Sequence, residues 1–346
     1  MTETYRKLKE WYEQNRRILP WREDPTPYHV WISEIMLQQT RVEAVRGYYA
    51  RFLTALPDVS ALAAAPEDVY LKLWEGLGYY SRVRNLHRAA VMVMEEYGGS
   101  IPSAEEELRR LPGIGRYTAA AIASIAFGKR AVALDGNLLR VFSRLTAYEG
   151  DIKEPAAGKA AEEYYLRILE NEPSAGLLNQ AFMDLGATVC LPNAAPHCDT
   201  CLLAEICLAH AAGRETAYPH LPAKKARKIE ERTVFLIRYG DAAILHKRSP
   251  KGLLAGLYEF PNADGKLTEE EALRYVAALG FEALRIRPLP PAKHIFTHKE
   301  WHMSAFEVRA DEFKSPLRED MLLLSVSEIR EKYSIPSAFA SYTALL

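Results

Sequence analysis

The sequence predicts a multidomain protein with a nearly all-helical first part and an α+β second part. Up to about residue 215, apolar residues recur at helical spacing in short segments separated by turn signals. After a basic connector the chain changes to β-branched and aromatic runs, at 233–239, 242–246 and 302–308. We therefore expect a helical region at 1–217, a linker at 218–228 and an α+β domain at 229–346.

Length and composition are those of a soluble globular protein. The chain has 346 residues, of which 49% are hydrophobic and 26% charged, and this length predicts two or three domains. The net charge of -1 means that an anionic partner must be held by local basic or amide-rich patches. We find neither a signal-peptide pattern nor an apolar run of transmembrane length. We therefore expect a cytoplasmic protein with no membrane association.

The four cysteines of the chain, Cys190, Cys198, Cys201 and Cys207, are clustered in one short window. Four neighbouring thiolates can complete a ligand shell for zinc or for iron-sulfur iron. The alternative is two local disulfides, but a long chain with so few cysteines and no signal peptide does not resemble a disulfide scaffold. The C-x7-C-x2-C-x5-C spacing matches neither the paired zinc patterns nor the bacterial ferredoxin run. Spacing alone therefore leaves the metal open.

A glycine-containing turn, Leu111-Pro-Gly-Ile-Gly-Arg-Tyr-Thr118, lies between two predicted helices. Gly113 and Gly115 permit a tight hairpin whose amide groups point into the start of the next helix. Such an amide nest binds a phosphate without sequence preference, although a G-x-G by itself is also typical of an ordinary helix connector. The whole string, followed by the small-residue helix 119–127, is similar to the helix-hairpin-helix of DNA repair glycosylases.

The chain resembles the MutY-type adenine DNA glycosylases, in the iron-sulfur branch of the helix-hairpin-helix superfamily. The matching stretches are 31–40, 76–82, 111–118, 133–140 and 179–190. The resemblance implies a helix-hairpin-helix glycosylase domain built from a hairpin-bearing module at about 22–130 and a cluster module from 1–21 plus 131–217. It also implies that the cysteines carry a 4Fe-4S cluster. This chain has seven residues between its first two cysteines, one more than the family usually has, and we expect the extra residue to bulge outward from loop 191–197.

Glu34 is the candidate general acid. It lies in the apolar helical stretch 30–37, where desolvation would raise the pKa of a carboxyl group and keep it protonated near neutral pH. Periodicity alone would favour a solvent-facing glutamate, and the resemblance reverses that preference. The resemblance implies that Glu34 protonates a flipped adenine at N7 and then helps the attacking water.

The resemblance implies three further catalytic residues. Asp135 stands where a helix is expected to begin, which fits an N-cap, and the resemblance implies that it stabilises a cationic sugar electrostatically or as a transient covalent partner. Asn137 would orient the residues that touch the substrate. Tyr117 occupies the hairpin position where glycosylase-lyases of the endonuclease III type carry a Schiff-base lysine, which implies that this chain does not cleave the DNA strand.

The resemblance also implies a set of DNA-contacting residues. Two of them, Leu77 and Tyr79, fit core positions equally well by their pattern alone. Thr297 replaces the serine that is common in the lesion-contacting loop of the family, and it keeps the hydroxyl group. The full set comprises Trp21, Arg22, Gln39, Thr40, Leu77, Tyr79, Gly113, Gly115, Gln180, Phe296, Thr297 and His298.

The second domain is similar to a Nudix fold through residues 252–261. The segment 267–276 lacks the spaced arginine and glutamates that would hold magnesium on a pyrophosphate, so we expect it to recognise a lesion and not to hydrolyse nucleotides. Its three successive glutamates fit the start of a helix.

The function implied is excision of adenine opposite 8-oxoguanine, and also opposite guanine, from duplex DNA by a monofunctional glycosylase. We expect double-stranded DNA with adenine:8-oxoguanine mispairs as the partner, a monomeric state, and a bacterial-type activity at the nucleoid. Two alternatives are a thymine or uracil mismatch glycosylase and a non-enzymatic lesion sensor. Glu34 and the second domain disfavour the first, while the joint presence of Glu34, Asp135 and Tyr117 disfavours the second.

Overall fold

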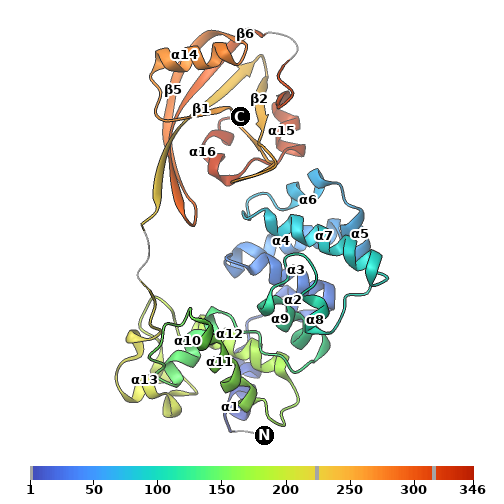
Figure 1. Ribbon diagram of the computed structural model, residues 1–346, viewed down its shortest axis with the longest axis vertical. Coiled ribbons are helices and arrows are strands. Elements are labelled where there is room, and N and C mark those ends of the chain that lie inside the picture. The colour runs from blue at the N-terminus through green and yellow to red at the C-terminus, as the bar shows by residue number, and fades with distance from the viewer. Residues whose placement is uncertain (1–2, 223–225, 314–316) are drawn as a thin grey trace. The chain divides into compact units, whose positions relative to one another are not determined.

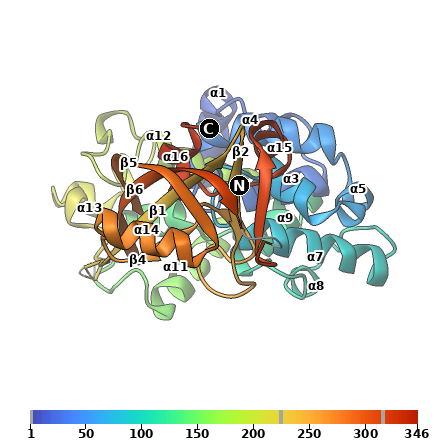
Figure 2. The ribbon, with the colours of Figure 1, turned by 90° about the horizontal axis from the view of Figure 1, so that it is seen from above.

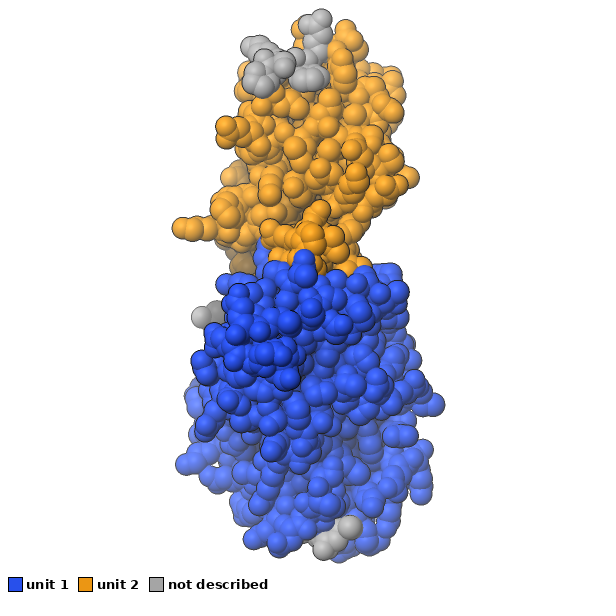
Figure 3. All heavy atoms as spheres, turned by 90° about the vertical axis from the view of Figure 1, so that its right-hand side faces the viewer, with its two compact units in different colours: residues 1–64, 84–223 blue, residues 65–83, 224–346 orange. Residues whose placement is uncertain are grey.

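The computed structural model describes residues 3–222, 226–313 and 317–346, which form two compact units (Figure 3). Unit 1 comprises Met1–Ala64 and Arg84–Ala223, and unit 2 comprises Ala65–Val83 and Lys224–Leu346. Residues 223–225 of the predicted linker lie outside the described residues. The predicted domain boundaries stay a prediction, and each unit is considered by itself below.

The described part of unit 1 consists of helices joined by loops, with one isolated β-bridge between Asp151 and His220. Its helices are α1 (Glu3–Asn15), α2 (Pro20–Glu23), α3 (Pro27–Leu37), α4 (Val42–Ala55), α5 (Val59–Ala64), α7 (Ser81–Glu96, whose first residues belong to unit 2), α8 (Glu105–Leu108), α9 (Arg116–Phe127), α10 (Gly136–Leu145), α11 (Pro155–Ile168), α12 (Ala175–Thr188) and α13 (Leu208–Ala211). Three short 3-10 turns follow α12, at Cys198–Thr200, Ala204–Ile206 and Glu215–Ala217.

Capping residues in the sequence determine where the helices around the site begin and end. Thr26 caps α3 through a hydrogen bond from His29, with Pro27 in the first turn. α9 ends at Gly128, whose φ of 65° is the left-handed conformation that favours glycine. Asp135 caps α10 by accepting from the Leu138 amide, so the N-cap expected there is found.

Packing gathers these helices around α9 and α12. α3 packs against α4 and α9, while α12 packs against α1, α9 and α10 (Figure 1). Gly176 in the first turn of α12 is needed for this packing, since a Cβ there would lie 2.6 Å from the carbonyl oxygen of Ser124 in α9. The middle of α3, the start of α9, the N-cap of α10 and α12 therefore face a common interior.

Unit 2 contains one sheet and several helices. The strands are β1 (Lys228–Tyr239), β2 (Ala242–Lys247), β3 (Tyr258–Glu259), β4 (Asn262–Asp264), β5 (Phe281–Ile295), β6 (Lys299–Phe313) and β7 (Met321–Ser325). The helices are α6 (Glu67–Leu73), α14 (Glu269–Ala278), α15 (Val326–Lys332) and α16 (Ala340–Thr343), with a 3-10 turn at Ser337–Phe339.

The sheet has the order β3-β2-β1-β6-β5, with β4 paired to β1 and β7 paired to β2. β1 and β6 run parallel, with Val234 opposite Ala305, and the other pairs are antiparallel. Alternate residues of β1 serve two cores, since Val234 packs with Phe339 while Phe235 packs with Val276. The sheet is therefore covered by α14 on one face and by the C-terminal helices on the other (Figure 2).

The predicted strand runs and the predicted helix of this unit are present. α14 begins with a capping box, in which Thr268 and Glu271 make both reciprocal hydrogen bonds. The pattern did not reveal β5, which contains three prolines, at 288, 290 and 291. The prolines are tolerated because β5 lies at the end of the strand order, where they remove few ladder hydrogen bonds.

Among the residues that the structure describes, none of the helices combines the length and apolarity needed to span a membrane.

Candidate active site

A cavity of about 270 Å³ in unit 1 brings together all four predicted catalytic residues. It is bordered by α2, α3, α9, α12 and the start of α10. The predicted residues that line it are Trp21, Arg22, Glu34, Thr40, Tyr117, Asp135, Asn137 and Gln180. Side chains from α2, α3, α9, α10 and α12, and from the turn after α3, thus converge on a space of the size that takes a small ligand.

Glu34 is buried in the cavity wall, with only 6% of its surface exposed. Burial raises the pKa of Glu34 to about 7, and the nearby Asp135 adds to the increase. The Tyr117 hydroxyl donates to Glu34 Oε2 at 2.6 Å, and this hydrogen bond and the charge of Arg22 oppose the increase. The desolvation expected from the apolar helix is therefore present, and a protonated acid is available near neutral pH.

Asp135 also lines the cavity and is held there as a hydrogen-bond acceptor. Its Oδ1 accepts from the Leu138 amide at 2.8 Å and its Oδ2 from Asn137 Nδ2 at 2.7 Å. Burial raises the pKa of Asp135, while these hydrogen bonds favour the ionised form. The N-cap and the candidate anion are the same group.

A continuous chain of hydrogen bonds leads from Asp135 to the cysteine-containing loop. Arg140 Nη2 donates to Asn137 Oδ1 at 2.9 Å, and Arg140 Nε donates to the carbonyl of Cys190 at 2.9 Å. Gly186 permits the close approach of α12, since a Cβ there would lie 2.6 Å from the Cβ of Asn137. The conformation of the cysteine loop and the position of Asp135 are therefore physically linked.

The four cysteines surround a second, small space of about 30 Å³. All four are half-buried free thiols. Arg144 Nη1 donates to Cys190 Sγ at 3.1 Å and to the Leu191 carbonyl, so a buried guanidinium faces the thiol group. Four sulfur atoms around one space make up a ligand set suited to a metal centre, and the Arg144 guanidinium beside Cys190 can offset thiolate charge.

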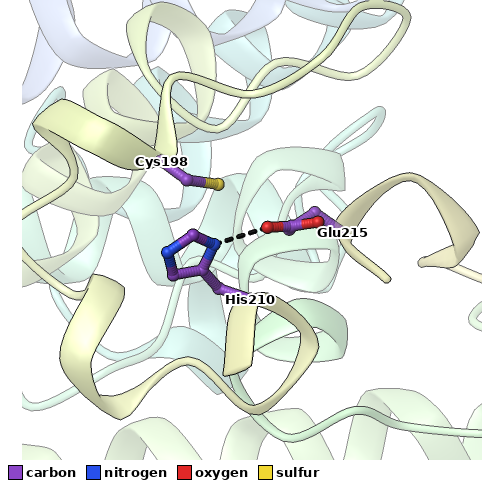
Figure 4. Close-up of side chains that lie close together, drawn as sticks. All are labelled: Cys198, His210 and Glu215. Carbon is purple, nitrogen blue, oxygen red and sulfur yellow. Dashed lines mark hydrogen bonds and ion pairs between the residues drawn. The ribbon is translucent and has the colours of Figure 1, made fainter. Parts of the chain in front are cut away.

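Cys198 also has two non-sulfur neighbours (Figure 4). The possible ligand atoms of Cys198, His210 and Glu215 lie within 4.8 Å of one another. His210 Nδ1 and Glu215 Oε1 are hydrogen-bonded, which occupies one possible ligand atom of each residue. The Cys198 side chain therefore lies between the cysteine cluster and a polar pair that the sequence did not reveal.

The hairpin between α8 and α9 requires only one of its two glycines. Gly113 has a φ of +80°, and a Cβ there would lie 2.7 Å from the Cβ of Asn85. Gly115 has an ordinary φ of -87° and caps α9, and a Cβ there would meet none of the described residues within 4 Å. The backbone conformation therefore requires glycine at position 113 and not at position 115, and the expected phosphate contact of both glycines stays a prediction.

The remaining predicted residues lie outside the cavity. Gln39 is exposed in the turn after α3, with a φ of 56°. In unit 2, Leu77 is buried, whereas Tyr79 is 48% exposed and has a φ of 49°. The two residues, equally compatible with the core by pattern, thus differ in the structure.

The predicted lesion loop is the tip of the β5–β6 hairpin in unit 2. Thr297 and His298 are exposed, and Phe296 packs against Trp301 at a ring-centroid distance of 4.9 Å. The hydroxyl groups of Tyr79 and Thr297 are 2.7 Å apart and hydrogen-bonded. The structure therefore joins the two predicted lesion-contacting segments within one unit.

Sequence reasoning missed several residues of the cavity. Arg17, Ser33, Arg41 and Met183 also line it, and Asp184, just behind it, binds both Arg17 and Arg22. The one sequence feature that could have indicated these residues is Asp184 itself, because a charged residue inside the otherwise apolar run of α12 is expected to have a buried partner.

Two sequence profiles match the chain. One, described as "HhH-GPD superfamily base excision DNA repair protein", matches residues 32–166, and one described as "NUDIX domain" matches residues 233–345. Mouse adenine DNA glycosylase is 34% identical over 367 residues, which cover 88% of this chain and 70% of the mouse protein. Adenine DNA glycosylase of Buchnera aphidicola (subspecies Schizaphis graminum) is 36% identical over 271 residues, which cover 76% of each chain. The chain belongs to the adenine DNA glycosylase family.

The chain is also similar to one more adenine DNA glycosylase and to two solved structures. Human adenine DNA glycosylase is 35% identical over 355 residues, which cover 84% of this chain and 64% of the human protein. A solved structure described as a thermostable thymine-DNA glycosylase has a TM-score of 0.55 and 27% identity, covering 60% of this chain and 95% of that one. An endonuclease III–DNA complex, with a TM-score of 0.51 and 22% identity, is similar in fold and covers 62% of this chain and 98% of that one.

The predicted fold class, a helix-hairpin-helix glycosylase domain followed by a Nudix-like α+β domain, is confirmed.

Proposed function

We propose that this protein is a monofunctional base-excision repair glycosylase that removes adenine opposite 8-oxoguanine, and opposite guanine, from duplex DNA. The observation that carries the proposal is the single cavity in which a buried Glu34, with a pKa of about 7, faces Tyr117, Asp135 and Asn137. The names of the relatives, adenine DNA glycosylases, support adenine as the base.

Glu34 is the proton donor in this mechanism. A base in a duplex must leave the stack before it can enter the cavity. Protonated Glu34 transfers its proton to N7 of adenine, and the electron pair of the breaking C1′–N9 bond moves to the base. Water then adds to C1′ and returns a proton to the Glu34 carboxylate. The products are free adenine and an abasic sugar, and Glu34 is regenerated as the acid.

Asp135 stabilises the sugar while it carries positive charge. Its carboxylate is already oriented by the Leu138 amide and by Asn137, so little rearrangement is needed when the charge develops. Asn137 is a positioning residue, because it fixes Asp135 and is itself held by Arg140.

Tyr117 supports the absence of lyase activity. Its hydroxyl group is used to orient Glu34 and, unlike an amine, a phenol cannot form an imine with the abasic sugar. The DNA strand should therefore stay intact until alkali or a separate enzyme cleaves it at the abasic site.

Recognition of the base opposite adenine is assigned to unit 2. Tyr79 and Thr297 present adjacent hydroxyl groups on an exposed surface, and hydroxyls can both donate to and accept from a base edge. Gly113 and Gly115 of unit 1 supply the amide groups for phosphate contact, and the open space over Gly115 leaves room for it.

Cys190, Cys198, Cys201 and Cys207 would hold a 4Fe-4S cluster. The donor set fits this group, since four thiols surround one small space and the Arg144 guanidinium offsets thiolate charge. When bound, the cluster ties the loop after α12 into one piece and offers a redox centre. Iron and sulfide analysis should give roughly four of each per chain, with broad absorbance near about 400 nm, and stoichiometric zinc without sulfide would contradict this assignment.

Single-turnover excision assays test the proposed reaction. The wild-type protein, in excess over duplexes with adenine opposite 8-oxoguanine or guanine and with thymine opposite guanine, should release adenine only. The product should become a strand break only after alkali treatment. Glu34→Gln should bind the duplex but lose adenine release, because the amide has no proton of suitable acidity to transfer.

The alternatives correspond to other outcomes of the same assay. Thymine release would favour the activity named for the thymine-DNA glycosylase neighbour, and tight binding without any base release would favour a lesion sensor. Near-wild-type excision by Glu34→Gln would remove Glu34 from the mechanism.

A further inference from the structure

Asp184 of α12 is a fully buried carboxylate bound by two arginines of the cavity wall. Arg17 donates to it from the backbone amide, at 3.1 Å to Oδ2, and from Nε, at 2.6 Å to Oδ1. Arg22 donates from Nη1, at 2.7 Å to Oδ2, and from Nη2, at 3.0 Å to Oδ1. These four hydrogen bonds use both lone-pair sites of each carboxylate oxygen.

The arginines, and not the carboxylate, face the cavity. Arg17 and Arg22 both line it, whereas Asp184 does not. The contacts of Arg22 with Asp184 and with the Arg17 carbonyl need only three of its five N–H donors. Because the acceptors of Asp184 are fully used, this part of the wall can offer a base hydrogen-bond donors and positive charge.

Such a wall matches the chemistry of adenine. The ring nitrogens of adenine are acceptors, so guanidinium N–H groups can bind one edge of the ring while Glu34 protonates it at N7. A base whose ring nitrogens carry hydrogens would place donors against donors. Orientation is essential here, because a guanidinium donates only within its plane and small misplacements at a reacting centre are costly.

We propose that Asp184 is the positioning residue of the adenine-binding wall, fixing Arg17 and Arg22 so that their guanidinium donors meet the flipped base opposite Glu34. The inference rests on the proposed adenine glycosylase function. Tyr12 supports the same arrangement, since its ring lies under Arg22, with 5.6 Å between the guanidinium carbon and the ring centroid, and its hydroxyl donates to Gln180.

The charges in this part of the site also affect Glu34. The groups that act on Glu34 are Tyr117 from α9, Asp135 at the start of α10 and Arg22 from α2, and the positive charge of Arg22 lowers the pKa of Glu34. Asp184 partly neutralises Arg17 and Arg22. Removal of the Asp184 charge should therefore lower the pKa of Glu34 further, so that activity is lost at a lower pH.

The decisive experiment compares Asp184→Asn with wild type in single-turnover excision over a range of pH. The enzyme concentration is varied to separate the saturated rate from the half-saturating concentration. We expect the saturated rate to fall by about 100-fold, as for a misplaced binding group, with duplex affinity nearly unchanged. We also expect the alkaline limb of the rate profile to move to lower pH.

The double variant Asp184→Asn/Arg17→Gln separates position from charge. This variant restores the wild-type net charge of residues 17, 22 and 184, so the alkaline limb of the rate profile should return to its wild-type pH. The saturated rate should stay low, because Arg22 has lost the carboxylate that anchors it. Recovery of the rate in the double variant would overturn the positioning role. If Asp184→Asn does not fold, as judged by cooperative melting, the rate of the double variant, which leaves less unpaired buried charge, is compared with that of Arg17→Gln, and equal rates would overturn the positioning role of Asp184.

Asp58→Asn is the matched control for the same chemical change. Asp58 accepts from the Ala61 amide at 2.8 Å on the surface and does not line the cavity, so its loss should affect stability and not the rate profile. If folded Asp184→Asn has the wild-type rate and pH profile, Asp184 is only a structural tie and our inference is wrong. If wild type itself releases no adenine, the proposed function fails independently of Asp184.

Discussion

Tyr117→Phe should move the alkaline limb of adenine excision to higher pH. The Tyr117 hydroxyl donates to Glu34 Oε2 at 2.6 Å, and this hydrogen bond lowers the pKa of Glu34 against the larger effect of burial. The balance is a pKa of about 7. Removal of the hydroxyl leaves burial unopposed on that oxygen, so the pKa of Glu34 should rise.

The size of the shift follows from the strength of this hydrogen bond. A hydrogen bond to a charged group contributes about 1.5–3 kcal/mol, and about 1.4 kcal/mol corresponds to one pKa unit. The neutral acid also accepts a hydrogen bond from Tyr117, so the difference between the two protonation states is smaller. We expect an increase of about 1 unit, which moves the pKa of Glu34 from about 7 to about 8.

The sign of the effect on the rate is determined by the role of Glu34. Excision requires the protonated acid, so activity is lost as the pH rises through the pKa of Glu34. The measurement is the single-turnover rate of adenine release from pH about 5 to about 10, at saturating enzyme. The midpoint of the alkaline limb is diagnostic, because the plateau also depends on how well Glu34 is oriented.

Tyr28→Phe is the matched control. The Tyr28 hydroxyl is also buried and donates to the Leu56 carbonyl at 2.8 Å, but Tyr28 does not line the cavity. This variant loses a buried hydrogen bond and should keep the wild-type alkaline limb. An unchanged or lowered midpoint in Tyr117→Phe would show that the alkaline limb does not report Glu34 as held by Tyr117.

Three other predictions test separate parts of the structure. The pKa of Glu34 is raised from 4.5 to about 7, so its stabilising contribution is present below about pH 4.5 and lost as the pH rises through 7. Glu34→Gln should therefore match wild type in free energy of unfolding near pH 4 and exceed it by up to about 3 kcal/mol at pH 9, in denaturant titrations. Thr297→Ala should reduce the preference for 8-oxoguanine over guanine by about 5- to 150-fold. The measurement is the ratio of the adenine excision rates opposite the two bases at one salt concentration. An unchanged ratio would contradict a role of Thr297 in lesion contact. Gly113→Ala should destabilise unit 1 by about 1–3 kcal/mol, because of its positive φ and the contact with Asn85, whereas Gly115→Ala should cost less than about 1 kcal/mol; equal losses would refute the argument.

Local patterns determined much of this protein. The apolar stretch 30–37 predicted the desolvation of Glu34, because a helix buried on most sides removes water from any carboxyl group it carries. The spacing of the cysteines predicted that they would gather, since one short loop can turn all four sulfur atoms inward. The capping box at Thr268 was predictable for the same reason, as its partners are three residues apart.

Only the tertiary structure decided which distant residues meet. Asp184 is 167 residues from Arg17 and 162 from Arg22, and the three combine because α12 packs beside the segment that follows α1. Tyr79 and Thr297 are 218 residues apart and share a hydrogen bond. Periodicity identifies the buried face of a helix but not the element that covers it, because the partner is selected by the packing of the whole core.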